Sequence, residues 1–103
     1  MVQELSAEQF PEVVGKGNVV VDFFADWCGP CKMMSPLFAE LSEEMKDVTF
    51  AKVDVQKAEE LASEQGVQGI PAIYFYKDGK KVGESIGFVQ KNQLKEKIEE
   101  VFS

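Results

Sequence analysis

Residues 19–36 read VVVDFFADWCGPCKMMSP, and this stretch decides the fold. It opens with Val19–Ala25, an almost unbroken apolar run, and such a run is typical of a strand buried on both faces of a sheet. The residues after Cys31 are apolar at spacings of three and four, which indicates an amphipathic helix. The stretch therefore predicts a central strand that leads into a helix, with Cys28 and Cys31 at the junction.

On either side of this stretch, extended and helical patterns alternate along the chain. Further strands are expected at residues 2–5, 48–55, 72–77 and 80–85. Further helices are expected after Pro11, over residues 58–65 and around residues 94–102. Asp78 and Gly79 form a hairpin signal, which makes the last two strands antiparallel, whereas strands separated by helices pair in parallel. The predicted fold class is therefore α/β, a central mixed β-sheet of four to five strands with helices on both faces, in one domain over residues 1–103.

The composition is that of a water-soluble globular domain, with 45% hydrophobic and 28% charged residues. The formal net charge of −7 argues against a nucleic-acid partner, because such proteins usually carry a basic surface. The first residues show no targeting pattern, and the longest apolar run is too short to cross a membrane. We therefore expect a cytoplasmic protein without a nucleic-acid or membrane partner.

Cys28 and Cys31 are the only cysteines, and a pair at this spacing fits three kinds of site. A closed zinc site needs four ligands, usually cysteine or histidine, and the chain has no histidine, so no metal is expected. A structural disulfide across so small a loop would contribute only about 2 kcal/mol, and a reducing compartment would tend to open it. The third kind, a redox-active dithiol that cycles between thiols and a disulfide, fits best.

The junction between strand and helix gives the two cysteines different expected roles. Cys28 lies at the N-terminus of the predicted helix, where unpaired N–H groups and the helix dipole favour a thiolate. We therefore expect Cys28 to be the exposed nucleophile and Cys31, one turn into the helix, to be the more buried resolving thiol. Gly29 and Pro30 set the turn between them.

Two segments resemble the thioredoxin family: residues 19–36, which contain WCGPC, and residues 69–80, which read GIPAIYFYKDGK. Gly87 also falls where the family has a glycine, and the resemblance covers essentially the whole chain. It implies the thioredoxin fold and a general protein thiol-disulfide oxidoreductase that reduces client disulfides, acts as a monomer and uses no cofactor beyond the redox-active Cys28–Cys31 disulfide. The implied partners are a thioredoxin reductase and disulfide-containing client proteins. Two alternatives are an oxidase or isomerase of the same fold and a non-catalytic binding module.

Asp22 and Lys52 are charged residues inside apolar strands. A carboxylate is costly to bury without a partner, so Asp22 either reaches a polar or solvent-filled pocket or has a function. Lys52 by itself fits an edge lysine whose ammonium reaches water. The family resemblance implies that Asp22 is a buried acid/base for Cys31 and that Lys52 is the partner of Asp22.

Ile70 and Pro71 form the second dipeptide of interest. An X–Pro bond is cis in only about 5% of cases in folded proteins, so the dipeptide alone does not predict a cis bond. The resemblance implies a cis Pro71 beside the dithiol and a free backbone at Ile70 that pairs with a client strand. It also implies an apolar substrate-binding patch around the cysteines, formed by Trp27, Gly29, Pro30, Gly69, Ile70 and Gly87. Without the resemblance, Trp27 would be expected in the core.

Three residues depart from the family pattern. Phe24 stands where many relatives have a second tryptophan, Ala72 where a threonine is common, and Phe88 where a small residue is frequent. Phe88 fits either a core position or an enlarged apolar rim of the patch. These departures concern partner preference rather than the dithiol chemistry.

Overall fold

A computed structural model describes residues 1–103 as a five-stranded sheet with helices. In chain order the elements are β1 (Val2–Glu4), α1 (Phe10–Val14), β2 (Asn18–Phe24), α2 (Gly29–Glu44), β3 (Thr49–Asp54), α3 (Glu59–Glu64), β4 (Ala72–Lys77), β5 (Lys80–Ile86) and α4 (Lys91–Val101). Each strand and helix expected from the sequence is present, and the strand boundaries agree closely. The longest helix, α2, has 16 residues, and no helix is long and apolar enough to cross a bilayer.

The sheet has the strand order β1-β3-β2-β4-β5, so β2 lies at its centre. Strands β1, β3 and β2 pair in parallel, whereas β4 is antiparallel to both β2 and β5. The predicted mixed sheet is therefore confirmed. The register places Asp22 of β2 between Lys52 of β3 and Ile73 of β4. Because side chains alternate along a strand, Asp22 and Phe24 face one side of the sheet and Phe23 faces the other.

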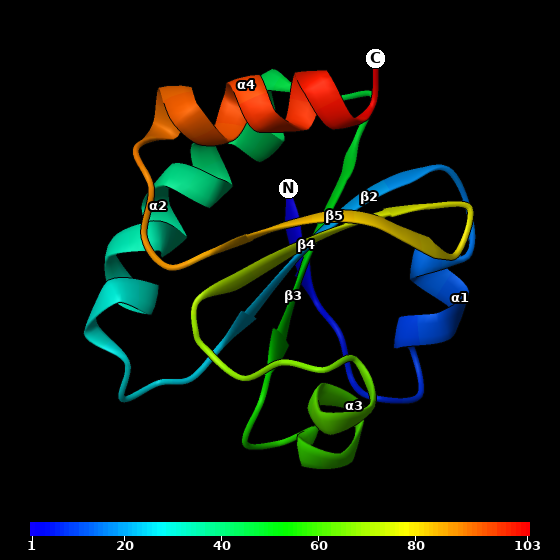
Figure 1. Ribbon diagram of the computed structural model, residues 1–103, viewed down its shortest axis with the longest axis vertical. Coiled ribbons are helices and arrows are strands. Elements are labelled where there is room, and N and C mark those ends of the chain that lie inside the picture. The colour runs from blue at the N-terminus through cyan, green and yellow to red at the C-terminus, as the bar shows by residue number, and fades with distance from the viewer.

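Helices cover both faces of the sheet, with α1 and α3 on one side and α2 and α4 on the other (Figure 1). The side under α1 and α3 holds a core of 13 buried residues that includes Val21 and Phe23. The side under α2 and α4 holds a core of 10 buried residues that includes Val20 and Phe38. Strand β2 contributes alternate residues to both cores, which explains why its sequence is apolar almost throughout.

The hairpin between β4 and β5 turns at Asp78 and Gly79, whose φ angles are both positive, at 49° and 88°. A two-residue turn of type I′ requires such angles, and Asp-Gly is one of the pairs that meet this requirement best. The Gly17 N–H donates to Asp78 Oδ1 at 2.8 Å, and the Asp78 N–H donates to the Gly17 carbonyl. These bonds fix the hairpin against the start of β2, at the end of the strand remote from Cys28.

Candidate active site

The cysteine pair lies where β2 ends and α2 begins. Cys28 is the N-cap residue of α2, with an extended backbone (φ −87°, ψ 112°), and Cys31 lies in the first turn. The Cys31 N–H donates to Cys28 Sγ at 3.2 Å, so this sulfur takes the place of a capping oxygen. The two residues form a disulfide with 5.2 Å between their Cα atoms, a usual separation for such a bond. The structure therefore describes the oxidised form.

The start of α2 favours negative charge on the Cys28 sulfur. The first N–H groups of a helix have no partner within it, and the helix dipole places partial positive charge at that end. Pro30 has no N–H, so the N–H of Cys31 is the one that reaches the sulfur. A thiolate at Cys28 accepts the same hydrogen bond, which lowers the cost of losing the thiol proton.

Both cysteines are buried, and the expectation that Cys28 is exposed is wrong. The exposed fractions are 5% for Cys28 and 4% for Cys31. The pair packs with Ala25, and the partly buried Val55 and Ile70 lie against this small cluster. A place at the start of a helix does not by itself determine exposure, because segments that lie far along the chain cover the sulfurs.

Trp27 directly precedes Cys28, whereas Ile70 comes from a distant segment of the chain and packs against the cysteine cluster. Trp27 is 67% exposed, so it is not a core residue. The Ile70–Pro71 bond is cis, as the resemblance implies. Ile70 makes no backbone hydrogen bond, whereas the Pro71 carbonyl accepts one from the Gly87 N–H at 2.8 Å. The backbone of Ile70 is therefore free to pair with another chain beside the cysteines.

Of the other residues of the expected patch, Gly29, Pro30 and Gly69 are exposed and Gly87 is partly buried. A Cβ atom at Gly29 would meet nothing within 4 Å, whereas one at Gly69 would lie 3.3 Å from the Ile86 side chain. Ile86, at the end of β5, is 48% exposed and extends the apolar surface beside Gly69. Ile86 was not expected in this patch, although its place next to Gly87 was an available signal.

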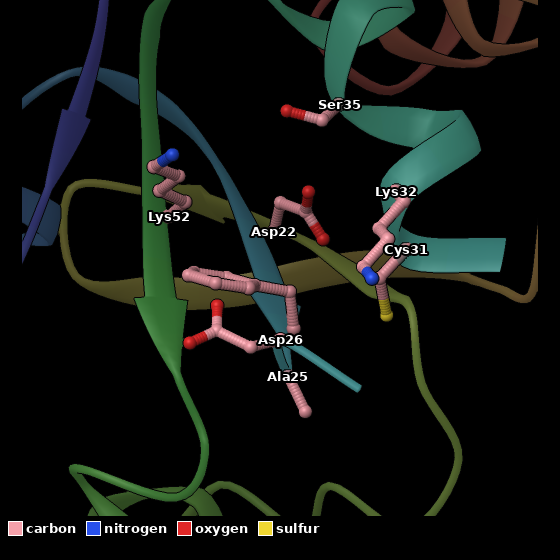
Figure 2. A pocket seen from close by; sticks show the side chains of 8 residues that line it. Asp22, Ala25, Asp26, Cys31, Lys32, Ser35 and Lys52 are labelled. Atoms are coloured by element: carbon pink, nitrogen blue, oxygen red, sulfur yellow. The ribbon is translucent and has the colours of Figure 1, made fainter. Parts of the chain in front are cut away.

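A cavity of about 180 Å³ lies behind the cysteine pair, between β2, β3 and the first turns of α2 (Figure 2). It is lined by Asp22, Phe24, Ala25, Asp26, Cys31, Lys32, Ser35 and Lys52. In Figure 2, Asp22 points from β2 toward α2, with Lys52 of β3 on one side and Cys31 on the other. Ser35 was not expected here, although it lies one helical turn after Cys31. No group of three or more metal-ligating side chains is placed to hold a metal ion.

Asp22 is buried in the wall of this cavity, with 3% of the residue exposed. Its Oδ1 atom is the one buried side-chain oxygen or nitrogen that has no hydrogen-bond partner. Burial disfavours the charged form and raises the pKa of Asp22 to about 7, and the positive charge of Lys52 partly opposes this rise. A carboxyl group with such a pKa both accepts and releases protons at neutral pH.

Lys52 lies next to Asp22 but forms no ion pair with it. The two residues are register partners on neighbouring strands, yet no nitrogen–oxygen distance of 4.0 Å or less joins them. The Lys52 ammonium instead lies over the ring of Phe24, 5.3 Å from the ring centroid. Lys52 therefore acts on Asp22 through space and not through a direct contact.

The three residues that depart from the family pattern have different surroundings. Phe88 is partly buried and packs against the core under α2 and α4, without being one of its ten buried residues. Ala72 is fully buried in β4. Phe24 is partly buried, lines the cavity and packs against the cysteine cluster. Of the three, Phe24 is the residue that bears on the site.

Comparison with known proteins gives consistent matches along the chain. The sequence profile of the family described as thioredoxin matches residues 1–100. The chain is 52% identical over 79 residues to the thioredoxin of Mycoplasmoides gallisepticum, which covers 77% of this chain and 79% of that one. It is 43% identical over 94 residues to the thioredoxin of Chlamydia trachomatis, with coverage of 91% and 92%. The crystal structure of a Malassezia sympodialis thioredoxin superposes with a TM-score of 0.90 at 37% identity, over 99% of this chain and 94% of that one.

These matches agree with the geometry. The five-stranded mixed sheet, covered by helices on both faces, is the thioredoxin fold of the solved neighbour. The Cys-x-x-Cys pair is at disulfide distance, at the N-terminus of α2. The chain therefore belongs to the thioredoxin family and is a thiol-disulfide oxidoreductase that reduces protein disulfides.

Proposed function

We propose that this protein reduces a broad set of client disulfides by a reaction in which Cys28 attacks and Cys31 resolves. The observation that carries the proposal is the hydrogen bond from the Cys31 N–H to Cys28 Sγ at the N-cap of α2. It gives the two sulfurs different surroundings. The Cys28 sulfur accepts a hydrogen bond from the N–H of Cys31 at the helix start, whereas Cys31 lines the cavity that contains Asp22. This asymmetry supports a fixed order of attack.

In the first step, the Cys28 thiolate attacks one sulfur of a client disulfide. A bond forms between Cys28 Sγ and that sulfur, and the client S–S bond breaks. The second client sulfur leaves as a thiolate and takes up a proton. The client is then held to Cys28 by a mixed disulfide, and the start of α2 has stabilised the attacking thiolate.

In the second step, Cys31 loses its proton to Asp22, directly or through water in the cavity. The Cys31 sulfur attacks Cys28 Sγ, the bond from Cys28 to the client breaks, and the client leaves as a dithiol. Two electrons have then passed from the Cys28–Cys31 dithiol to the client. A carboxyl group with a pKa of about 7 suits this proton transfer, because this pKa is close to neutral pH and near that of a thiol.

The client docks as an extended chain against Ile70. The backbone N–H and carbonyl of Ile70 make no hydrogen bond within the protein, so both are available to a client strand. The exposed Trp27 and the small exposed residues Gly29 and Gly69 leave room for a close approach. Backbone pairing is insensitive to the client's side chains, which supports a broad range of clients.

A thioredoxin reductase is the proposed electron donor, because each turnover leaves Cys28 and Cys31 oxidised. Proteins of the thioredoxin family generally act with such a reductase and with disulfide-bonded clients. The electrons pass through the cysteine pair alone, so we propose no further cofactor and no metal. The proposed setting is the cytoplasm, with the protein acting as a monomer.

An insulin-reduction assay driven by dithiothreitol tests the order of attack. Cys28→Ser is expected to lose activity entirely, because the nucleophile is gone. Cys31→Ser is expected to lose turnover but to accumulate a mixed disulfide with insulin, which mass spectrometry detects and excess dithiothreitol releases. The double variant Cys28→Ser/Cys31→Ser is the matched control and should trap nothing. Activity in both single variants, or trapping by Cys28→Ser instead of Cys31→Ser, contradicts the proposal.

A further inference from the structure

Phe24, Asp22 and Lys52 meet at one wall of the cavity. Phe24 and Asp22 are two residues apart on β2, so both side chains leave the same face of the sheet. Lys52 is the register partner of Asp22 on β3, and all three side chains line the cavity. The Lys52 ammonium therefore has two possible partners, the carboxyl group of Asp22 and the aromatic face of Phe24.

In the structure, the Lys52 ammonium contacts the aromatic face. Lys52 Nζ lies 5.3 Å from the centroid of the Phe24 ring. A cation is attracted to an aromatic face within about 6 Å. No ion pair joins Lys52 to Asp22, and Asp22 Oδ1 has no hydrogen-bond partner. Figure 2 shows Lys52 on β3 to one side of Asp22 on β2.

We propose that Phe24 is a positioning residue whose ring holds the Lys52 ammonium and keeps this cation from closing onto the Asp22 carboxyl. The inference rests on the proposed function of Asp22 as the proton acceptor for Cys31. A direct ion pair with Lys52 would make Asp22 a weaker base, less able to take the proton of a thiol. The Phe24 ring therefore keeps the pKa of Asp22 near neutral pH, although a lysine lies beside this carboxyl group.

The other charged groups around Asp22 are less well placed to act on it. Lys32 of α2 and Asp26 of the loop before α2 line the cavity, but both residues are exposed to solvent, which screens their charges. Cys31 faces Asp22 from the first turn of α2 and does not titrate while it is in the disulfide. Strand β4 contributes an apolar side chain beside Asp22. Lys52 is thus the charge whose position matters most for Asp22.

Two acidic residues of the sheet are neighbours of Lys52: Glu4 on β1 and Asp54, two residues further along β3, whose Oδ1 accepts from the N–H groups of Gln56 and Lys57. Glu4 is the register partner of Lys52 on β1. Its carboxylate lies 3.8 Å from Lys57 Nζ, and Glu4 forms no ion pair with Lys52. The aromatic ring of Phe24 is therefore the contact that holds the Lys52 ammonium in place.

A carbon-13 NMR titration of the Asp22 carboxyl group tests this inference in the oxidised protein. Phe24→Leu removes the ring and is expected to lower the midpoint of the Asp22 titration by about 1 pH unit, as expected when a cation closes onto a carboxylate. Phe24→Met is a second ringless variant with a larger side chain, in case the leucine variant does not fold. Phe24→Tyr keeps a ring and is expected to keep the midpoint of the unmodified protein.

The titration needs no turnover, so it is independent of the proposed function. If Asp22→Asn resolves mixed disulfides at the normal rate, the role of Asp22 in the reaction fails while the effect of Phe24 on its titration stays measurable. Conversely, an unchanged titration in Phe24→Leu leaves the role of Asp22 intact and overturns only the role of the ring.

Lys52→Met separates the proposed effect of the ring from simple hydration of the cavity. A smaller side chain at position 24 also admits water, which by itself lowers the Asp22 midpoint. If the ring acts through Lys52, Phe24→Leu lowers the Asp22 midpoint much less in the Lys52→Met background than in the protein that retains Lys52. An equal lowering with and without Lys52, or no lowering in the Phe24→Leu variant that retains Lys52, overturns the proposal.

Discussion

Neighbouring residues of β2 face opposite sides of the sheet, and the buried tyrosines on one side have hydrogen-bond partners whereas the buried Asp22 Oδ1 on the other has none. Under α1 and α3, the buried tyrosines are satisfied: the Tyr74 hydroxyl donates to the Gly66 carbonyl at 3.3 Å, and the Tyr76 hydroxyl donates to Gln65 Oε1 at 2.6 Å. Under α2, Asp22 Oδ1 is buried without a partner. The hydrogen bonds of the tyrosines stabilise the fold, whereas the unpaired Asp22 carboxyl lowers its stability.

The difference locates the chemistry of the protein. An unpaired buried carboxyl group lowers stability when it ionises, and strongly shifted pKa values are found preferentially at functional sites. Asp22 lines the same cavity as Cys31, where a proton must be removed during resolution. Substitutions of neighbouring residues on the two sides of β2 are therefore expected to change stability in opposite directions.

The largest effect is expected from Phe23→Ala, on the side under α1 and α3. Phe23 is fully buried, and its ring lies 5.1 Å from that of Tyr74 and 6.2 Å from that of Phe10. Removing such a ring leaves a cavity and typically costs about 3–5 kcal/mol in the free energy of unfolding. Urea denaturation of the oxidised protein measures the loss. A loss below about 1 kcal/mol would show that this core is not packed as described.

The opposite sign is expected from Asp22→Asn, one residue away. The folded pKa of about 7 lies above the unfolded value of about 3.9, so the folded protein binds this proton more tightly. Stability therefore falls as the pH rises from about 4 to 7 and changes little above that. Asparagine does not ionise, so the stability gained by the variant is expected to grow by about 3 kcal/mol between pH 4.5 and pH 8.

Denaturation of Asp22→Asn and of the unmodified protein at both pH values measures this growth. The variant is also expected to resolve mixed disulfides more slowly at neutral pH, which stopped-flow tryptophan fluorescence follows through Trp27, the single tryptophan. A stability difference that does not change with pH would mean that burial does not raise the pKa of Asp22 as described.

A smaller effect is expected from Tyr76→Phe on the satisfied side. The substitution removes the hydroxyl that donates to Gln65 Oε1 and keeps the ring in its T-shaped contact with Phe10. One hydrogen bond of this kind contributes about 1 kcal/mol, so the variant is expected to be less stable by about that amount at every pH from 5 to 8. A gain in stability would mean that the Tyr76 hydroxyl, like the Asp22 carboxyl, lowers stability, which contradicts the difference described here between the two sides.

The smallest effect is expected from Lys91→Met, at the surface where α4 meets α2. Lys91 Nζ pairs with Glu40 at 3.0 Å and with Glu44, and Lys95 reaches Glu44 at 3.5 Å. Exposed ion pairs are screened by salt and contribute little. We expect a slight destabilisation in low salt that disappears in 1 M sodium chloride. A loss that persists in high salt would indicate that packing rather than charge joins the two helices.

Much of the fold was predictable because its main signals are local. The apolar run of Val19–Ala25 indicates a central strand, and Asp78 with Gly79 indicates a hairpin. The two cysteines at the start of a helix indicate a dithiol, because the spacing and the helix terminus are both visible in the sequence. The order of strands across the sheet was not predictable in the same way, since it depends on how distant segments pair.

Several features of the site depend on contacts between distant segments and could not be predicted. The burial of Cys28 depends on Val55 and Ile70, which come from other parts of the chain. The Lys52 ammonium could contact either Asp22 or Phe24 on β2, and the sequence pattern of a strand does not show that it lies over the Phe24 ring. The sequence alone fits Phe88 to two alternatives, because its packing against the core under α2 and α4 depends on residues that are distant in the chain.

The most direct test of the account is the carboxyl titration of Asp22 in the oxidised protein. Carbon-13 NMR of the side-chain carboxyl gives its midpoint without any assay of activity, and Asp22→Asn identifies the resonance. The account predicts a midpoint near pH 7, because the carboxyl group is buried and forms no ion pair. A midpoint near pH 4, the value of an ordinary solvated aspartate, would contradict the central claim that burial in β2 raises the pKa of the carboxyl beside Cys31 to near neutral pH.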